Sequence, residues 1–182
     1  MNGIDRTTDE RRIVVGVDGS RPSRAALRWA LGEARLTGAV VEAVTSWDEP
    51  GVYGRGITVS PEESDAVAGS ELAEVVMRET GRCPGAVVRQ RVEHGSAGEV
   101  LVKLSAGAAL LVVGSRGLGG FVGALLGSVS RYCVRYARCP VVLVRGDFTA
   151  GPAGDERPAA KDPSGPTPGP SGPREAEAGS AD

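Results

Sequence analysis

The sequence contains few of the residues on which metal, disulfide and nucleic-acid sites depend. One of its 182 residues is histidine, three are cysteine, and aromatic residues make up 4%. The lone histidine, His94, leaves little material for a histidine-ligated metal cluster or a histidine-based triad. Cys83, Cys133 and Cys139 are odd in number and lack metal-ligand spacing, which predicts reduced thiols in a cytosolic fold. A net charge of −2 with so few aromatic residues argues against a nucleic-acid partner.

Long apolar runs are also missing. No stretch approaches the roughly 20 apolar residues that a membrane span needs, and no early apolar stretch resembles a signal peptide. We therefore expect a cytoplasmic protein without a membrane partner.

Large apolar residues are scarce at both ends of the chain. Residues 1–11 are polar and balanced in charge, which predicts a disordered lead-in. Residues 147–182 are rich in proline, glycine and acidic residues and contain one large apolar residue, Phe148. Such a composition buries too little surface to offset chain entropy, so it predicts a disordered acidic tail. The remaining residues, 12–146, are predicted to form one domain.

Within this domain, short apolar runs alternate with segments of helical spacing. The predicted strands are 13–17, 40–47, 86–92, 109–113 and 141–145, and the predicted helices are about 20–38, 61–80, 98–104 and 122–137. This alternation predicts an α/β fold: an open, five-stranded, mostly parallel sheet with helices on both faces. We expect the Rossmann-like strand order 3-2-1-4-5. The first and fourth strands would then be neighbours, and their glycine-bearing turns would border one crevice.

The turn after the fourth strand lies in the glycine-rich stretch VVGSRGLGGFVGALLGSVS, residues 112–130. A Walker A loop is excluded because that motif needs a lysine before its serine or threonine, whereas Leu126 precedes the pair Gly127–Ser128. The dinucleotide fingerprint fails because Val122 stands where its last glycine should be. The spacing that remains is Gly114-x2-Gly117-x9-Gly127-Ser128, with Ser130 two residues further on.

Two explanations of this spacing are open from the residues alone. Glycines let backbone N–H groups approach a phosphate, and the helix start after Gly127 would offer unpaired N–H groups, with Ser128 and Ser130 adding hydroxyl donors. A packing loop between a strand and a helix needs glycines as well.

The same spacing resembles the ATP-binding motif of the universal stress protein family. The resemblance extends to IVVGVDGS at 13–20, to ALRWA in the next helix and to RYCVRYARCPVVLVR before the end of the domain. It spans residues 12 to 145 as a single domain. The chain departs from the family in reading AGAAL at 106–110, where an aspartate often precedes the fourth strand.

The resemblance implies a set of nucleotide-binding residues. It places Asp18 near the ribose and phosphates, with Mg²⁺ as an indirect partner, and the adenine against the main chain of Val44 or Thr45. The full set is Gly16, Asp18, Val44, Thr45, Gly114, Ser115, Arg116, Gly117, Gly127, Ser128, Val129 and Ser130.

The resemblance also implies a function. We expect an ATP-binding regulator of a stress response or of signalling. We also expect a homodimer joined through the last strand, whose residues 141–144 form an apolar edge. The alternatives are a slow ATPase or nucleotidyl-transfer enzyme, and a nucleotide-free dimeric interaction module. The mapped positions hold neither histidine nor lysine, which favours binding over efficient catalysis. The sequence does not identify a protein partner other than a second copy of the chain.

Overall fold

The computed structural model describes residues 11–48, 60–117 and 126–146. The chain divides into two units, 1–150 and 151–182, and every described residue belongs to the first. The predicted lead-in, apart from Arg11, and the predicted tail lie outside the described residues.

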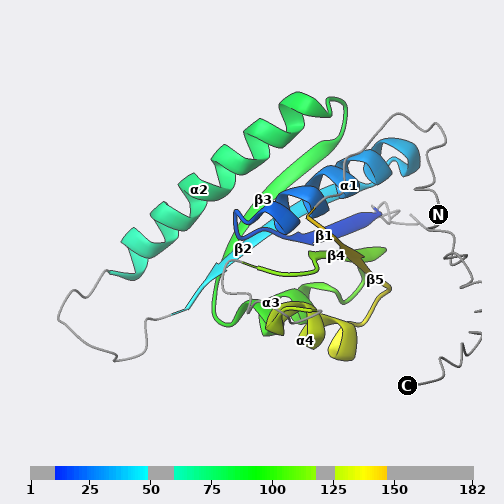
Figure 1. The fold of residues 1–182 in the computed structure, drawn as a ribbon. Helices are drawn as coiled ribbons and strands as arrows, with labels where there is room; N and C mark the ends of the chain where they lie inside the picture. The colour runs from blue at the N-terminus through cyan, green and yellow to red at the C-terminus, as the bar shows by residue number, and fades with distance from the viewer. Residues whose placement is uncertain (1–10, 49–59, 118–125, 147–182) are drawn as a thin grey trace, which may run out of the picture. The chain divides into compact units, whose positions relative to one another are not determined.

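Five parallel strands form one sheet in the order β3-β2-β1-β4-β5, which confirms the predicted fold class and strand order (Figure 1). The strands are β1 (Arg12–Gly16), β2 (Val40–Trp47), β3 (Val87–His94), β4 (Leu110–Gly114) and β5 (Val141–Val144). The helices are α1 (Arg21–Thr37), α2 (Pro61–Arg82), α3 (Ala97–Leu104) and α4 (Ser128–Tyr136).

The helices cover both faces of the sheet, as predicted. Figure 1 shows α1 and α2 on one face and α3 and α4 on the other. Leu27, Leu31 and Leu72 belong to the core beneath α1 and α2, whereas Leu101 and Cys133 belong to the core beneath α3 and α4. Because both faces are covered, β1, β2 and β4 consist largely of buried apolar residues.

Three predicted boundaries differ from the structure by two residues or more. The helix predicted from about residue 122 begins at Ser128; residues 126 and 127 are not helical, and 122–125 lie outside the described residues. Gly127 is extended (φ −69°, ψ 165°), and its N–H donates to the Ser115 carbonyl at 2.9 Å. This bond to a distant turn keeps Gly127 out of the helix. The strand β3 continues to His94 because it pairs with β2 as far as Trp47, and α2 continues to Arg82.

No helix in the described ranges combines the length and the apolar character that a membrane-spanning segment requires.

Candidate functional site

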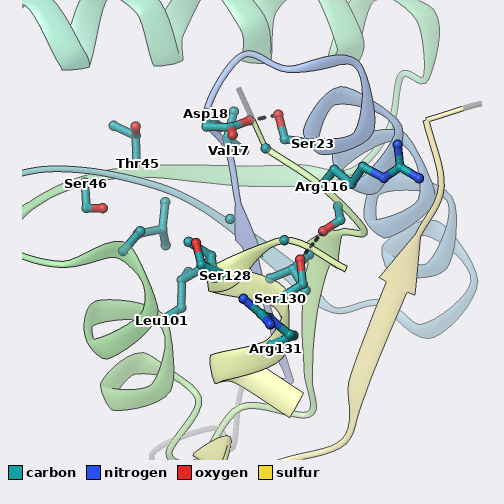
Figure 2. Close-up of a pocket in the computed structure, with 18 of the residues that line it drawn as sticks. Val17, Asp18, Ser23, Thr45, Ser46, Leu101, Arg116, Ser128, Ser130 and Arg131 are labelled. Atoms are coloured by element: carbon teal, nitrogen blue, oxygen red, sulfur yellow. Dashed lines mark hydrogen bonds between the residues drawn. The ribbon is translucent and has the colours of Figure 1, made fainter. Parts of the chain in front are cut away.

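A cavity of about 410 Å³ lies beyond the carboxyl ends of β1, β2 and β4, where the strand order reverses (Figure 2). Open α/β sheets bind their ligands at this place. Eleven of the twelve predicted site residues line it, namely Gly16, Asp18, Val44, Thr45, Gly114, Arg116, Gly117, Gly127, Ser128, Val129 and Ser130. Their roles as ligands of a nucleotide remain predictions.

The turn after β1 holds the Asp18 carboxylate in a fixed position. The N–H of Ser20 donates to Asp18 Oδ1 at 3.0 Å, and the N–H of Asp18 donates to Ser23 Oγ at 3.3 Å. The other carboxylate oxygen lies against Gly117, where an added Cβ would be 2.5 Å from Asp18 Oδ2. The absence of a side chain at Gly117 therefore allows the turns after β1 and β4 to meet.

Ser115 is the predicted site residue that does not line the cavity. Its N–H donates to the Val144 carbonyl at 2.7 Å, and its carbonyl accepts the Gly127 N–H. Ser115 thus joins the end of β5 to the start of α4 through main-chain bonds. These bonds support the loop, and the role of Ser115 as a nucleotide ligand stays a prediction.

Ser130 lines the cavity, and its hydroxyl, which the sequence predicts as a donor to a ligand, is engaged within the protein. Its Oγ donates to the Gly114 carbonyl at 2.7 Å, and the residue is buried. With its hydrogen engaged, the hydroxyl can only accept a bond from a ligand. Ser130 therefore fixes the end of β4 against α4, whereas Ser128 is exposed.

The glycines divide between the two explanations that the sequence left open. A Cβ on Gly114 would lie 2.7 Å from the Pro22 carbonyl carbon, so Gly114 is needed for packing against the first turn of α1. A Cβ on Gly16 would lie 2.8 Å from Leu101 Cδ1. At Gly127, by contrast, the nearest atom would be 3.4 Å away. Packing explains Gly114 and Gly16 but not Gly127. Gly119, Gly120 and Gly123 lie outside the described residues.

The start of α4 supplies the positive end of the cavity. The N-cap residue is Gly127, and within the described part of the chain no side chain caps this terminus. The first intrahelical bond runs from the Arg131 N–H to the Gly127 carbonyl, so the N–H groups of residues 128–130 precede the helical ladder. Such N–H groups, with the helix dipole, favour an anion.

The charged side chains of the described lining are Asp18, Arg116 and Arg131. Arg116 was predicted, but Figure 2 shows its guanidinium turned away from Thr45 and Ser128. Arg131 was not predicted, although it lies one helical turn after Ser128 and so on the same face of α4.

The opposite end of the cavity is largely apolar and was mostly missed by sequence reasoning. Leu101 of α3, which was not among the predicted site residues, forms part of the wall beneath Gly16. The Val44 carbonyl accepts the Val17 N–H at 2.8 Å, and Val44 is buried, whereas Thr45 and Ser46 are half-buried. The other lining residues without a prediction are Val17, Ser23, Ala97, Val113 and Leu126.

The side chains that line the cavity could hold a metal ion only together with oxygen atoms of a bound ligand. No group of three or more histidine, cysteine, aspartate or glutamate residues that could hold a metal occurs among the described residues. Mg²⁺ commonly binds one or two carboxylates together with phosphate oxygens and water. Asp18 could provide such a carboxylate beside a bound phosphate chain.

Comparison with known proteins places the chain in one family. A family model described as "Universal stress protein family" matches residues 10–145. A universal stress protein of Mycolicibacterium smegmatis is 36% identical over 152 residues, covering 80% of this chain and 51% of that protein. One from Mycobacterium tuberculosis is 37% identical over 134 residues, covering 73% and 45%. The chain thus spans about half the length of the curated relatives it matches.

Solved structures of universal stress proteins have the same fold. One in complex with cAMP is 28% identical, with a TM-score of 0.58, and the match covers 75% of this chain and 98% of that one. One from Archaeoglobus fulgidus in complex with dAMP is 26% identical, with a TM-score of 0.52 and coverage of 74% and 97%. The matched family model spans the whole described sheet and the cavity at its edge, and the chain belongs to the universal stress protein family.

Proposed function

We propose that this protein binds ATP in the cavity at the sheet edge and acts as a nucleotide-dependent regulator in a stress response or in signalling. The observation that carries the proposal is the start of α4, which has no side-chain cap in the described structure and faces a cavity that also holds the fixed carboxylate of Asp18. An anion site and a hydroxyl-binding group in one cavity suit a nucleotide.

The chemistry of the walls suggests how the nucleotide lies. The phosphates bind the N–H groups of residues 128–130, because these carry the positive end of the α4 dipole. The ribose hydroxyls donate to Asp18, because a carboxylate accepts hydrogen bonds and repels phosphate. The base occupies the largely apolar end, between Leu101 and the main chain of Thr45 and Ser46. The relatives solved with cAMP and dAMP support an adenine nucleotide.

Mg²⁺ would enter with the triphosphate, and Asp18 would hold it through water. The metal would neutralise phosphate charge that the two lining arginines leave uncompensated. Removal of Mg²⁺ should therefore weaken ATP binding more than AMP binding.

Binding is favoured over rapid turnover. The described lining residues include neither histidine nor lysine, so the site lacks the usual general bases and a phosphate-neutralising lysine. A slow ATPase or nucleotidyl-transfer activity is the second proposal, since Asp18 could orient a water. A nucleotide-free interaction module is the third.

One experiment separates these functions. The purified full chain is denatured, released nucleotide is identified by chromatography, and the affinities of ATP, AMP, cAMP and dAMP are measured with and without Mg²⁺. Released ATP, or tightest binding of ATP with Mg²⁺, supports the proposal. ATP turnover by the unmodified protein that is lost in Asp18→Asn would establish the second proposal, a slow enzyme. A protein that releases no nucleotide on denaturation and binds none of the four nucleotides would support the third proposal, a nucleotide-free interaction module.

We further propose a homodimer joined through β5. This strand is an edge of the described sheet and carries no charge, and its Leu143 is 37% exposed. The other edge strand, β3, carries Arg89, Arg91 and Glu93, which discourage pairing. Leu143→Lys or Leu143→Pro should give monomers in analytical ultracentrifugation. The control Val87→Lys, on β3, should leave the dimer intact, and a dimer that survives both Leu143 changes would contradict the proposal.

We also propose a cytoplasmic location and no nucleic-acid or membrane partner. The reduced thiols that the odd cysteine count predicts support the location. Cell fractionation of a tagged full chain tests it.

A further inference from the structure

A second cavity, of about 490 Å³, lies against α2 at the same edge of the sheet. It shares four residues with the first cavity: Val17, Asp18, Thr45 and Ser46. These residues follow β1 and β2, so the ends of these two strands form a ridge with one cavity toward α3 and α4 and the other toward α2. A ligand in the first cavity would therefore touch residues that also bound the second.

The α2 wall of the second cavity is mostly aliphatic. Residues 64, 67, 68, 71, 72 and 75 repeat at helical spacing and form one face of α2. Leu72, at 2% exposure, lies deep, whereas Val67 is 57% exposed, more than most large aliphatic residues of a monomer. The wall thus continues from the core to an apolar mouth.

Trp47 completes the wall in a fixed position. Its indole N–H donates to Asp65 on α2, and its ring lies 4.5 Å from the His94 ring between centroids. Because the ring is held from two sides, Trp47 is a rigid part of the wall.

The charges of the described lining disfavour a second phosphate group in the second cavity. Its charged residues among the described lining are Asp18 and Glu71, both acidic. The first cavity, in contrast, has two arginines and the start of α4. An uncharged apolar group suits the second cavity, because burial against aliphatic side chains is favourable and no anion faces a carboxylate.

Asp18 determines how the two cavities can share one ligand. In the proposed binding mode its carboxylate faces the ribose, and Asp18 belongs to both linings. A substituent on one ribose hydroxyl would extend toward α2, while the other hydroxyl still donates to Asp18. We propose that the ligand class of this protein includes adenine nucleotides that carry an uncharged apolar group on the ribose, and that this group occupies the second cavity. The inference rests on the proposed function.

The probe is ATP with an N-methylanthraniloyl ester on its ribose, compared with unmodified ATP. Burial of this ring should tighten binding about tenfold after the cost of ordering it. The group accepts energy from tryptophan. Transfer should therefore fall more in Trp47→Phe than in Trp29→Phe, because Trp47 lines the second cavity and Trp29 does not.

Two variant pairs test the position of the group. Ala68→Phe fills the second cavity, and Ala73→Phe is its control on an exposed position of the same helix. Val67→Glu puts a charge at the mouth, and Met77→Glu puts one at an exposed apolar position outside the lining. Ala68→Phe and Val67→Glu should remove the tenfold advantage of the ester and change ATP affinity less than twofold. The two controls should leave both affinities unchanged.

The outcomes are distinct for the two proposals. If ATP binds and the ester gains nothing, or its gain survives Ala68→Phe and Val67→Glu in folded protein, the further inference is wrong and the proposed function stands. If neither ATP nor the ester binds, the proposed function fails and the inference fails with it. Thermal unfolding of each variant verifies that the protein is folded.

Discussion

Two helices begin at the same edge of the sheet, and they begin differently. At α1, Ser20 is the N-cap, its Oγ accepts the Ser23 N–H, and Pro22 has no N–H to satisfy. At α4, Gly127 is the N-cap, and no side chain within the described residues bonds to the first turn. The protein caps the first helix terminus with its own side chain, and no described side chain caps the second, which is the terminus that we propose binds phosphate.

The preceding turns look alike in the sequence, VVGVDGS after β1 and VVGSRGL after β4. Their hydrogen bonds separate them. Asp18 and Ser20 bond within their own turn, whereas Ser115 bonds to β5 and to Gly127. The first turn is self-contained, and the second spans the elements that surround the cavity.

Gly114→Ala should have the largest effect on stability. The new Cβ would lie 2.7 Å from the main chain of Pro22, in the capped first turn of α1, and overpacking of this kind costs about 3 kcal/mol. Gly127→Ala, whose Cβ meets nothing closer than 3.4 Å, should cost less than about 1 kcal/mol. Urea unfolding measures the free energy of unfolding of both variants. Equal losses of stability would contradict the conclusion that packing requires Gly114 but not Gly127.

Gly127→Asp should make the start of α4 resemble that of α1. The backbone at Gly127 is extended and suits any residue, and an aspartate there would cap the first turn. We expect ATP affinity to fall about a hundredfold, or 2.7 kcal/mol, because the carboxylate takes the N–H groups and repels phosphate, while stability is kept. Gly127→Asn, a cap without charge, should give a smaller loss in the same calorimetric titration. ATP binding at wild-type strength in Gly127→Asp would refute the phosphate site.

Gly117→Ala should test the contact between the two turns. The added Cβ would meet Asp18 Oδ2, so the carboxylate must move, and ATP affinity should fall about tenfold, or 1.4 kcal/mol. In an Asp18→Ala background the same change should cost nothing, because the clash is gone. If Gly117→Ala still lowered ATP affinity tenfold in the Asp18→Ala background, Gly117 would affect binding independently of Asp18.

Ser20→Ala should have the smallest effect, and on stability alone. Loss of this N-cap costs about 1 kcal/mol of unfolding free energy. ATP affinity should stay within twofold of wild type, since the α1 terminus is satisfied internally. A tenfold loss of affinity would mean that both helix termini serve the ligand.

The sequence was a good guide where local patterns decide the structure. Continuous apolar runs identified β1 and β4, and helical spacing identified α1, which the structure ends at the C-cap Gly38 (φ +70°). The start of α4 was not predictable in this way. Its boundary depends on the bond from Gly127 to Ser115, twelve residues earlier in the chain.

The roles of the site glycines could not be predicted from spacing either. Gly114 and Gly127 belong to one motif, yet the first is needed because Pro22 packs on it, whereas a Cβ on the second would make only ordinary contacts at 3.4 Å or more. Leu101 has the helical spacing of a core residue, and only the fold brings it beneath Gly16 at the cavity wall. A motif identifies which segments meet, and the contacts decide what each residue does.

Hydrogen exchange of the main-chain amides with and without ATP and Mg²⁺ tests the central claim most directly. We predict that ATP slows exchange of the Ser128, Val129 and Ser130 amides at the start of α4 and leaves the Arg21 and Ser23 amides of α1 unchanged. Slowing at α1 with no change at α4 would contradict the account.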